Sequence, residues 1–289
     1  MATERAHPRE SPLGIAVRGV LRKKSSRVAA ILLSLIILVG VLAPLIAPYD
    51  PAAQPDIVAM KDLPPSLAHP FGTDPYSRDV LSRVLYGARL SLTIGILATF
   101  VSLTVGVAYG AIAGYLGGMV DAVMMRVLDA LLSIPRLLLL LGVLVAWPHL
   151  SIGALILFLG LTGWFGLSRL VRGQVLALKH AEFVTAAQAL GASRRRILWR
   201  HLLPNLVSPI AVAATLGVAH VIVLEAGLSF LGIGVPQPLA SWGNIIQDGV
   251  DQIATLWWMS LFPGLFMVLT VVTLNILGEA LRDSYERRV

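Results

Sequence analysis

The sequence of 289 residues lacks cysteine and has little charge. Without cysteine there are no disulfides, no thiolate nucleophiles and no thiolate metal sites. Only 13% of the residues are charged and 56% are hydrophobic, whereas soluble domains have about 25% charged residues. The mean hydropathy is +0.80. These values exclude a soluble enzyme and a disordered protein, and the formal net charge of +7 indicates membrane topology rather than nucleic-acid binding.

Signatures of catalysis and of nucleotide binding are also missing. Of the four lysines only Lys24 precedes a serine, and Lys23 rather than glycine stands before it, so there is no G-x-x-x-x-G-K-[ST] phosphate loop. Neither H-E-x-x-H nor G-x-S-x-G occurs. We therefore expect no catalytic residues, no metal site and no ATP binding through a phosphate loop.

Long apolar runs are abundant instead. A helix needs about 20 mostly apolar residues to cross the hydrocarbon layer. The runs are 28–47, 90–113, 124–147, 151–167, 209–235 and 256–281, and the third is broken by Pro135. They are continuous rather than alternating, which favours helices over membrane strands. We predict an all-α membrane protein with six transmembrane helices.

The basic residues predict the orientation of these spans. With six spans, eighteen lysines and arginines fall on one side, mainly in 1–27 and 168–206, and four fall on the other, all in 48–89. Basic loops stay on the cytoplasmic side. We therefore predict that both termini and the segment 168–206 are cytoplasmic.

The runs divide the chain into four parts. They are a basic cytoplasmic tail 1–27, a first helix with its outer loop 28–89, a five-helix core 90–281 with a cytoplasmic segment 174–206, and a cytoplasmic tail 282–289. At the end of the outer loop, Val80, Leu81, Val84 and Leu85 share one helical face, which predicts a short helix on the outer interface. The alternative is a plain loop that continues into the span.

The second run carries Gly106, Gly110 and Gly114 at four-residue spacing, which makes a flat stripe that another backbone can approach closely. We expect this stripe to serve helix packing, either within the chain or next to a pathway or a subunit contact.

A few polar or aromatic residues in or beside the runs are individual candidates. Asp129 follows Arg126 by three residues, which predicts a local ion pair. Glu225 has no basic residue in its run, so we expect it to reach the interface or a partner, a proton relay with His220 being the alternative. Trp242, in a turn-rich outer segment, is expected to anchor the chain at the interface.

The segment 182–204 has the pattern of a helix, a sharp turn and a second helix. Residues 181–190 favour a helix that Gly191 ends, and Ser193 is placed to cap a second helix, 194–203, which ends at Pro204. The first helix offers a small apolar surface beside basic residues: Ala186, Ala187, Ala189, Leu190 and Arg194 to Arg196. Such a surface favours docking of a partner, the alternative being a helix that lies on the inner leaflet.

This segment resembles the "EAA" loop of bacterial binding-protein-dependent ABC transporter permeases, whose pattern is E-A-A, three residues, G, nine residues, I-x-L-P. Ala186-Ala187, Gly191 and Leu203-Pro204 match the pattern. Thr185 stands in place of the glutamate, for which Glu182 is a candidate substitute, and His201 stands in place of the isoleucine.

Other segments resemble the second, C-type permease of the peptide and nickel branch. They are Tyr49-Asp50-Pro51, Gly72-Thr73-Asp74, Arg78-Asp79, Ser82-Arg83, Gly87-Ala88-Arg89, Ser91-Leu92, Glu225-Ala226, Leu228 to Gly232 and Ser241-Trp242-Gly243.

The resemblance implies a type I ABC importer permease (MetI-like) fold in the bacterial cytoplasmic (inner) membrane. It implies half of a translocation pathway for di- or oligopeptides, with no cofactor, because separate subunits bind ATP. The implied partners are a homologous second permease, two ATP-binding subunits, an extracytoplasmic substrate-binding protein and the lipid bilayer, with no nucleic acid. Nickel chelates and glutathione are alternative substrates. An ion-driven secondary transporter, which would need midplane ionisable groups or inverted repeats, is an alternative function.

The resemblance also assigns coupling to the ATP-binding subunits. The coupling residues are Glu182, Thr185, Ala186, Ala187, Leu190, Gly191, Ala192, Ser193, Arg196, Leu203 and Pro204.

Overall fold

The computed structural model describes residues 14, 23–147 and 150–286. Most of the predicted tail 1–27, and residues 287–289 of the tail 282–289, lie outside the described residues. The described part is helical. Its α-helices are α2 (Lys24–Ile46), α3 (Val80–Leu116), α4 (Gly118–Leu132), α5 (Arg136–Ala146), α6 (Ile152–Leu178), α7 (Glu182–Ala189), α8 (Arg194–Ile197), α9 (Val207–Phe230), α10 (Trp242–Gly249) and α11 (Trp258–Glu286).

Among the described residues, five helices are long and apolar enough to cross a membrane: α2, α3, α6, the continuous stretch Arg194–Phe230 that contains α9, and α11. The sixth span is the pair α4 and α5, which is bent by 70°. The break has a local cause, because Pro135 lacks a backbone N–H and disfavours helical geometry at Ile134. Counted with this broken span, the predicted six helices are confirmed.

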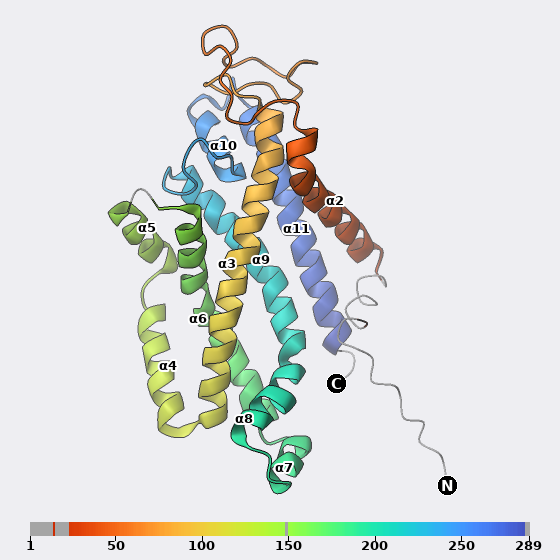
Figure 1. Cartoon of the computed structure of the whole chain (residues 1–289), viewed down its shortest axis with the longest axis vertical. Helices are drawn as coiled ribbons and strands as arrows, with labels where there is room; N and C mark the ends of the chain where they lie inside the picture. Colours follow the sequence, from red (N-terminus) through yellow and green to blue (C-terminus); the bar gives the residue numbers. More distant parts are fainter. Residues whose placement is uncertain (1–13, 15–22, 148–149, 287–289) are drawn as a thin grey trace.

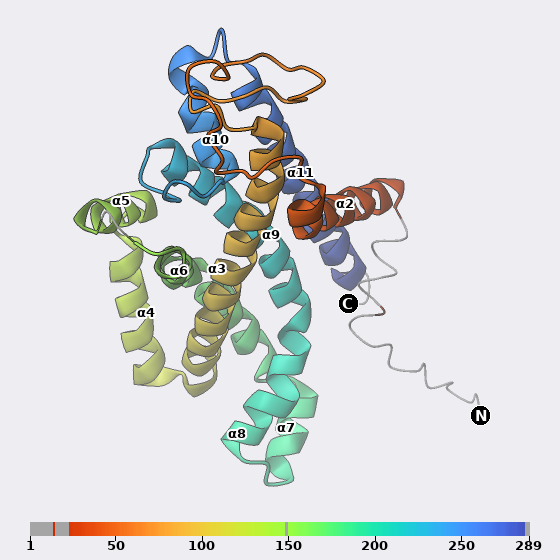
Figure 2. The same ribbon diagram turned by 45° about the horizontal axis from the view of Figure 1, so that its top comes forward.

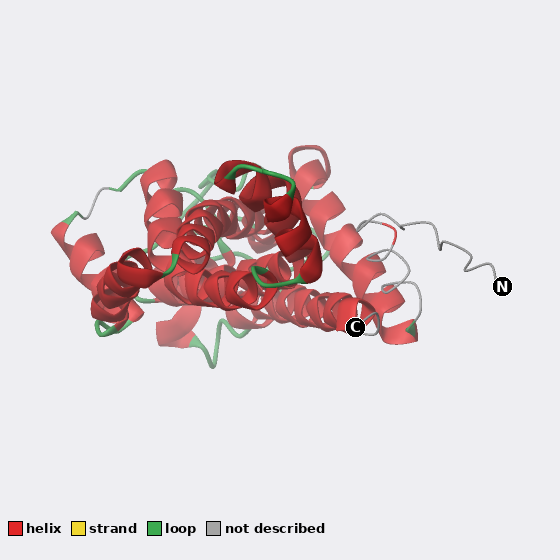
Figure 3. Ribbon diagram, turned by 90° about the horizontal axis from the view of Figure 1, so that it is seen from below, coloured by secondary structure: helices red, strands yellow, loops and turns green. Residues whose placement is uncertain are grey.

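The spans run between two ends of an elongated molecule (Figure 1). One end carries α7 and α8, and the other carries α10 and the loop 47–79. Seen from the first end, α7 and α8 stand in front of the spans (Figure 3). The Nζ atom of Lys23 lies 2.5 Å from a carboxylate oxygen of Asp283, which joins the start of α2 to the last turns of α11. Because α7 and α8 lie at one end and the loop 47–79 lies at the other, the arginine-rich segment 168–206 lies opposite the outer loop, as predicted.

The helices are packed unevenly. α3 and α6 form the most extensive helix pair, and α9 and α11 pack beside α3. α4 and α5 stand on one flank of the bundle and α2 on the other (Figure 2). On α2 the side chains of Ile31, Val41 and Leu45 are exposed by 68%, 65% and 82%, as expected of a helix that faces lipid.

The predicted short interfacial helix is wrong as a separate element, because α3 runs unbroken from Val80 to Leu116. Asp79 caps the helix: one of its carboxylate oxygens accepts a hydrogen bond of 2.8 Å from the backbone N–H of Ser82. Val80 and Val84 are completely buried, so the apolar face that suggested a membrane-surface helix packs against the protein core. No helix-ending residue separates these turns from the span.

Candidate functional site

The predicted helix, glycine turn and second helix are present in the segment 182–204. α7 ends at Ala189, and Gly191 has a φ of +78°, a left-handed conformation that glycine adopts without strain. The N–H of Gly191 donates to the carbonyl of Gln188 over 2.9 Å, which closes the turn. The hydroxyl of Ser193 accepts from the N–H of Arg196 over 3.3 Å and so caps α8.

The second helix does not end at Pro204 as predicted. α8 continues through a π-helical turn (Leu198–Leu202) and a 3₁₀ turn (Leu203–Leu206) directly into α9. Pro204 lies in the first turn of the 3₁₀ segment, where its missing N–H leaves no hydrogen bond unmade. The unit of α7 and α8 is therefore continuous with a membrane span, and a displacement of one moves the other.

One face of this unit is anchored to the bundle. Val184 and Leu202 are completely buried and Ile197 is 1% exposed, in a cluster that includes Val171 and Val175 of α6. Ala187 lies on the same face as Val184, three residues away, and is only 8% exposed. The prediction that Ala187 belongs to the exposed apolar surface is therefore wrong.

The other face is open. Leu190 is 89% exposed and Trp199 is 65% exposed. Thr185 replaces the glutamate of the resembled pattern, and its hydroxyl donates to the carbonyl of Ala181 over 2.9 Å, so it is satisfied within α7. The remaining predicted coupling residues that are exposed are Glu182, Ala186, Gly191, Ser193, Arg196 and Pro204, whereas Ala192 and Leu203 are half-buried.

Two grooves border this open face. One, of about 500 Å³, is lined by Ser193, Arg195, Arg196 and Trp199. The other, of about 300 Å³, lies where α7 meets the ends of α3 and α6, and Lys179, Thr185, Gln188 and Arg194 are among its lining residues. The open face is therefore hollowed and strongly basic.

The glycine stripe of α3 lies against α6 within this chain. A Cβ atom at Gly110 would lie 2.3 Å from the carbonyl oxygen of Ser168, and one at Gly114 would lie 2.9 Å from that of Arg172. A Cβ atom at Gly106 would lie 2.8 Å from a methyl carbon of Leu167. The stripe therefore lets the α3 and α6 backbones approach closely, which is the packing alternative within the chain.

Two carboxylates of α4 are paired with arginines of α6. Asp121 accepts two hydrogen bonds from the guanidinium of Arg172, of 2.5 and 2.6 Å. Asp129 pairs with Arg169 rather than with Arg126, so the predicted local pair is wrong. Sequence spacing could not reveal this, because the partner comes from a helix that follows 40 residues later.

The opposite end of the molecule is braced by a buried charge network, defined here as Asp74, Arg78, Arg83, Gln237 and Asp248. Arg78 donates to Asp74 over 2.5 Å, to Asp248 over 2.8 Å and to Gln237 over 2.7 Å. Arg83 donates to Asp248 over 3.1 Å and is completely buried. This network joins the outer loop and the start of α3 to the α9–α11 connection. The sequence analysis did not single out Asp248. A signal was present, because the segment 236–255 contains no lysine or arginine, so a partner for Asp248 has to come from another part of the chain.

Two outer residues are placed differently from the prediction. Trp242 is completely buried and its indole N–H donates to the carbonyl of Val84 over 3.2 Å, so it belongs to the core and is not an interface anchor. Glu225 is also completely buried. It accepts hydrogen bonds from Ser229, over 2.6 Å, and from Ser91, over 3.3 Å. It therefore finds its partners inside the chain, and the prediction that it reaches the interface or a partner is wrong.

Two family models match separate parts of the chain. Residues 106–289 match the model of the "binding-protein-dependent transport system inner membrane component". Residues 11–65 match the "N-terminal TM domain of oligopeptide transport permease C".

Individual relatives extend this match to nearly the full length. The chain is 40% identical over 273 residues to the oligopeptide transport system permease protein OppC of Bacillus subtilis (strain 168), covering 93% of this chain and 88% of the relative. It is 38% identical over 275 residues to the dipeptide transport system permease protein DppC of the same strain, covering 95% and 85%. It is 39% identical over 272 residues to OppC of Haemophilus influenzae, covering 94% and 87%. The chain therefore belongs to the family of binding-protein-dependent transport system inner membrane components.

Proposed function

We propose that this chain is the permease subunit of a peptide-importing ABC transporter and forms half of the pathway for di- and oligopeptides. The names of the relatives support the substrate class, because oligopeptide and dipeptide permeases align over nearly the whole chain. The description of the matching family, which names an inner membrane component, supports a multi-pass location in the inner membrane.

The observation that carries the coupling mechanism is the shape of the unit of α7 and α8. One face of the unit is anchored on α6 by buried side chains, the other face is open, and the second helix continues into α9. A force applied to the open face therefore reaches two membrane spans. We infer that an ATP-binding subunit docks on this face and that closure of two such subunits moves α6 and α9.

The remaining partners follow from the same division of labour. A second, homologous permease completes the pathway, and an extracytoplasmic binding protein delivers the peptide at the end that carries α10 and the outer loop. The charge network of Asp74, Arg78, Arg83, Gln237 and Asp248 keeps that receiving end rigid, because it joins chain segments more than 150 residues apart.

Ala186 offers the sharpest test of the docking face, because it is exposed and lies beside the buried Ala187. A carboxylate at position 186 would be buried without a partner in the docked complex, at a cost of about 2–5 kcal/mol. Because about 1.4 kcal/mol is a factor of ten, we expect Ala186→Glu to lower ATP-driven peptide uptake more than tenfold. The stability of the permease itself should not change.

The measurement is uptake and ATP hydrolysis by proteoliposomes that hold the complete transporter. Ala186→Ser is the matched control, since it adds one polar atom but no charge at the same exposed position and should leave uptake unchanged. Full uptake by the Ala186→Glu transporter, with an unchanged ratio of peptide moved to ATP hydrolysed, would refute the docking assignment. A wild-type complex that moves no peptide would refute the substrate class.

A further inference from the structure

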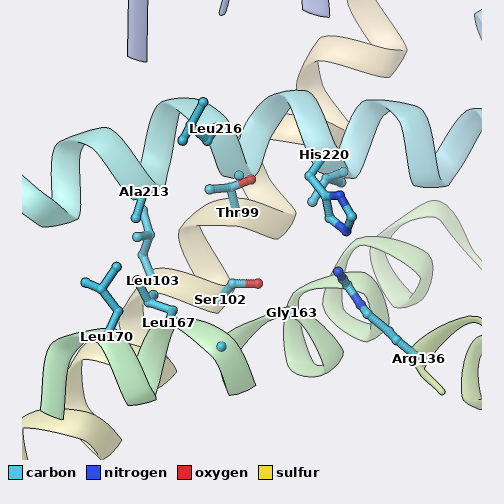
Figure 4. A pocket seen from close by; sticks show the side chains of 13 residues that line it. Thr99, Ser102, Leu103, Arg136, Gly163, Leu167, Leu170, Ala213, Leu216 and His220 are labelled. Atoms are coloured by element: carbon cyan, nitrogen blue, oxygen red, sulfur yellow. The ribbon is translucent and has the colours of Figure 1, made fainter. Parts of the chain in front are cut away.

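A cavity of about 310 Å³ lies inside the membrane-spanning part, between α3, α5, α6 and α9. Its polar residues gather at one end, where Arg136 of α5 and His220 of α9 point toward each other beside Thr99 and Ser102 of α3 (Figure 4). The opposite end is apolar and is lined by leucines. The cavity is therefore amphipathic, with one basic end.

Arg126 and Arg136 are the two arginines that lie within the predicted apolar runs, and Arg136 is the one of the two that lines the cavity. It begins α5 at the break of the bent span, where the positive end of that helix adds to its charge. Its guanidinium donates to the carbonyl of Leu159 over 2.8 Å and to the hydroxyl of Thr162 over 3.3 Å. Both acceptors are neutral, and within the described part of the chain no carboxylate forms an ion pair with it.

An arginine inside a bilayer without a counter-ion is costly, so such residues mark binding sites or pathways. The cavity is shaped around it, because a Cβ atom at Gly163 would lie 3.1 Å from the guanidinium and 2.4 Å from the hydroxyl oxygen of Ser102. This glycine keeps the basic end of the cavity open. The site is therefore built for a charge that this chain does not itself supply.

Thr99 gives an independent sign of a missing ligand. It is 4% exposed and its hydroxyl oxygen is buried without a hydrogen-bond partner among the described residues. A buried hydroxyl left unpaired is destabilising and is uncommon in native proteins. Since Thr99 lines the same cavity as Arg136, an acceptor bound there would satisfy both groups.

His220 shows which side of the bundle the cavity faces. It lies in the middle of α9, yet its side chain is exposed. A polar side chain on the lipid side would be unfavourable, so this face is covered by something polar in the assembled transporter. The two halves of a pathway meet at such a face.

We propose that this cavity binds the terminal carboxylate of a peptide in transit, with the side chain of the last residue in the leucine-lined end. The proposal rests on the proposed function, because it takes peptides as the substrate class. Arg136 supplies the charge, Thr99 supplies a hydroxyl donor and His220 flanks the entrance. The site recognises a feature common to all peptides, which suits a pathway that passes many sequences.

The test compares uptake of the tripeptide Ala-Ala-Leu with uptake of its C-terminal amide by proteoliposomes that hold the complete transporter. We expect Arg136→Gln to lower uptake of the free acid about tenfold or more and to leave uptake of the amide at its wild-type rate. Arg136→Lys keeps the charge and should restore much of the loss. The binding protein is the same in every arm, so its own preference cancels when each variant is compared with the wild type.

Two further variants keep the test decisive. Thr99→Val removes an unpaired buried hydroxyl at nearly constant shape, so it should fold normally and still lower uptake of the free acid several-fold. Arg126→Gln removes an exposed arginine from the same broken span and should change neither rate.

The outcomes separate the two proposals. If the wild type moves neither compound, the peptide function fails. If the wild type moves both compounds but Arg136→Gln and Thr99→Val leave both uptake rates unchanged, only the carboxylate site fails. The carboxylate site also fails if the variants lower uptake of the free acid and of the amide equally. Such an equal loss assigns Arg136 to an ion pair with an acidic side chain of the partner permease.

Discussion

Asp248 is the residue whose loss should most weaken the outer end of the permease. One of its carboxylate oxygens accepts hydrogen bonds from Arg78, over 2.8 Å, and from Arg83, over 3.1 Å. With Asp74 it balances these two arginines, so the formal charge of the buried network is zero. Asp248→Asn leaves one uncompensated positive charge at almost the same shape.

The structure sets the magnitude of this effect. The side chains of Arg83, Arg78 and Asp248 are 0%, 3% and 7% exposed, so solvent screens the charge only weakly. Removing one partner of a buried ion pair costs about 3–5 kcal/mol, whereas an exposed pair contributes about 0–1 kcal/mol. Asparagine keeps an oxygen that still accepts, so we expect about 3 kcal/mol for Asp248→Asn and up to about 5 kcal/mol for Asp248→Ala.

The assay is thermal or denaturant unfolding of the purified permease complex in detergent, followed by tryptophan fluorescence. Trp258 is a natural reporter, because its indole donates to the carbonyl of Thr73 in the outer loop over 3.1 Å. Asp251→Asn, an exposed aspartate three residues away, is the matched control and should change stability by less than about 0.5 kcal/mol.

A double-mutant cycle makes this reasoning refutable. Arg83→Gln added to Asp248→Asn restores neutrality, so the double variant should be about 1–3 kcal/mol more stable than the sum of the single effects predicts. Additive effects, or an Asp248→Asn protein as stable as the Asp251→Asn control, would show that Asp248 does not hold the outer loop.

The six spans and their alternating direction were predictable, because the cost of burying a charge in lipid acts on each segment by itself. Continuous apolar runs and the distribution of arginine therefore carry the topology. The break at Pro135 and the turn at Gly191 were equally local, since proline and glycine act on their own backbone.

Which side of each helix is buried, and which charged residues pair, was less predictable. Ala187 and Trp242 are small or aromatic residues that suit either a surface or a core, and the structure buries both. The partner of Asp129 could not be chosen either, because Arg126 is near in sequence whereas Arg169 is brought near only by α6. Contacts of this kind depend on how whole helices pack, which no short window of sequence contains.

Two further substitutions test the packing. Gly110→Ala places a Cβ atom 2.3 Å from the carbonyl oxygen of Ser168, so α3 and α6 must separate, and we expect a loss of about 1–3 kcal/mol in detergent unfolding. Gly173→Ala, which meets no atom within 4 Å, should instead gain up to about 1 kcal/mol from helix propensity. Trp242→Ala removes a completely buried indole from the outer core, which should cost about 3–5 kcal/mol. Trp242→Phe keeps most of the packing but loses the hydrogen bond to Val84, so about 1 kcal/mol is expected. Trp147→Ala, at a tryptophan that is 67% exposed, is the control. If Trp242→Ala unfolds like this control, then Trp242 contributes as a surface anchor does, and the outer end is held together by its charge network alone.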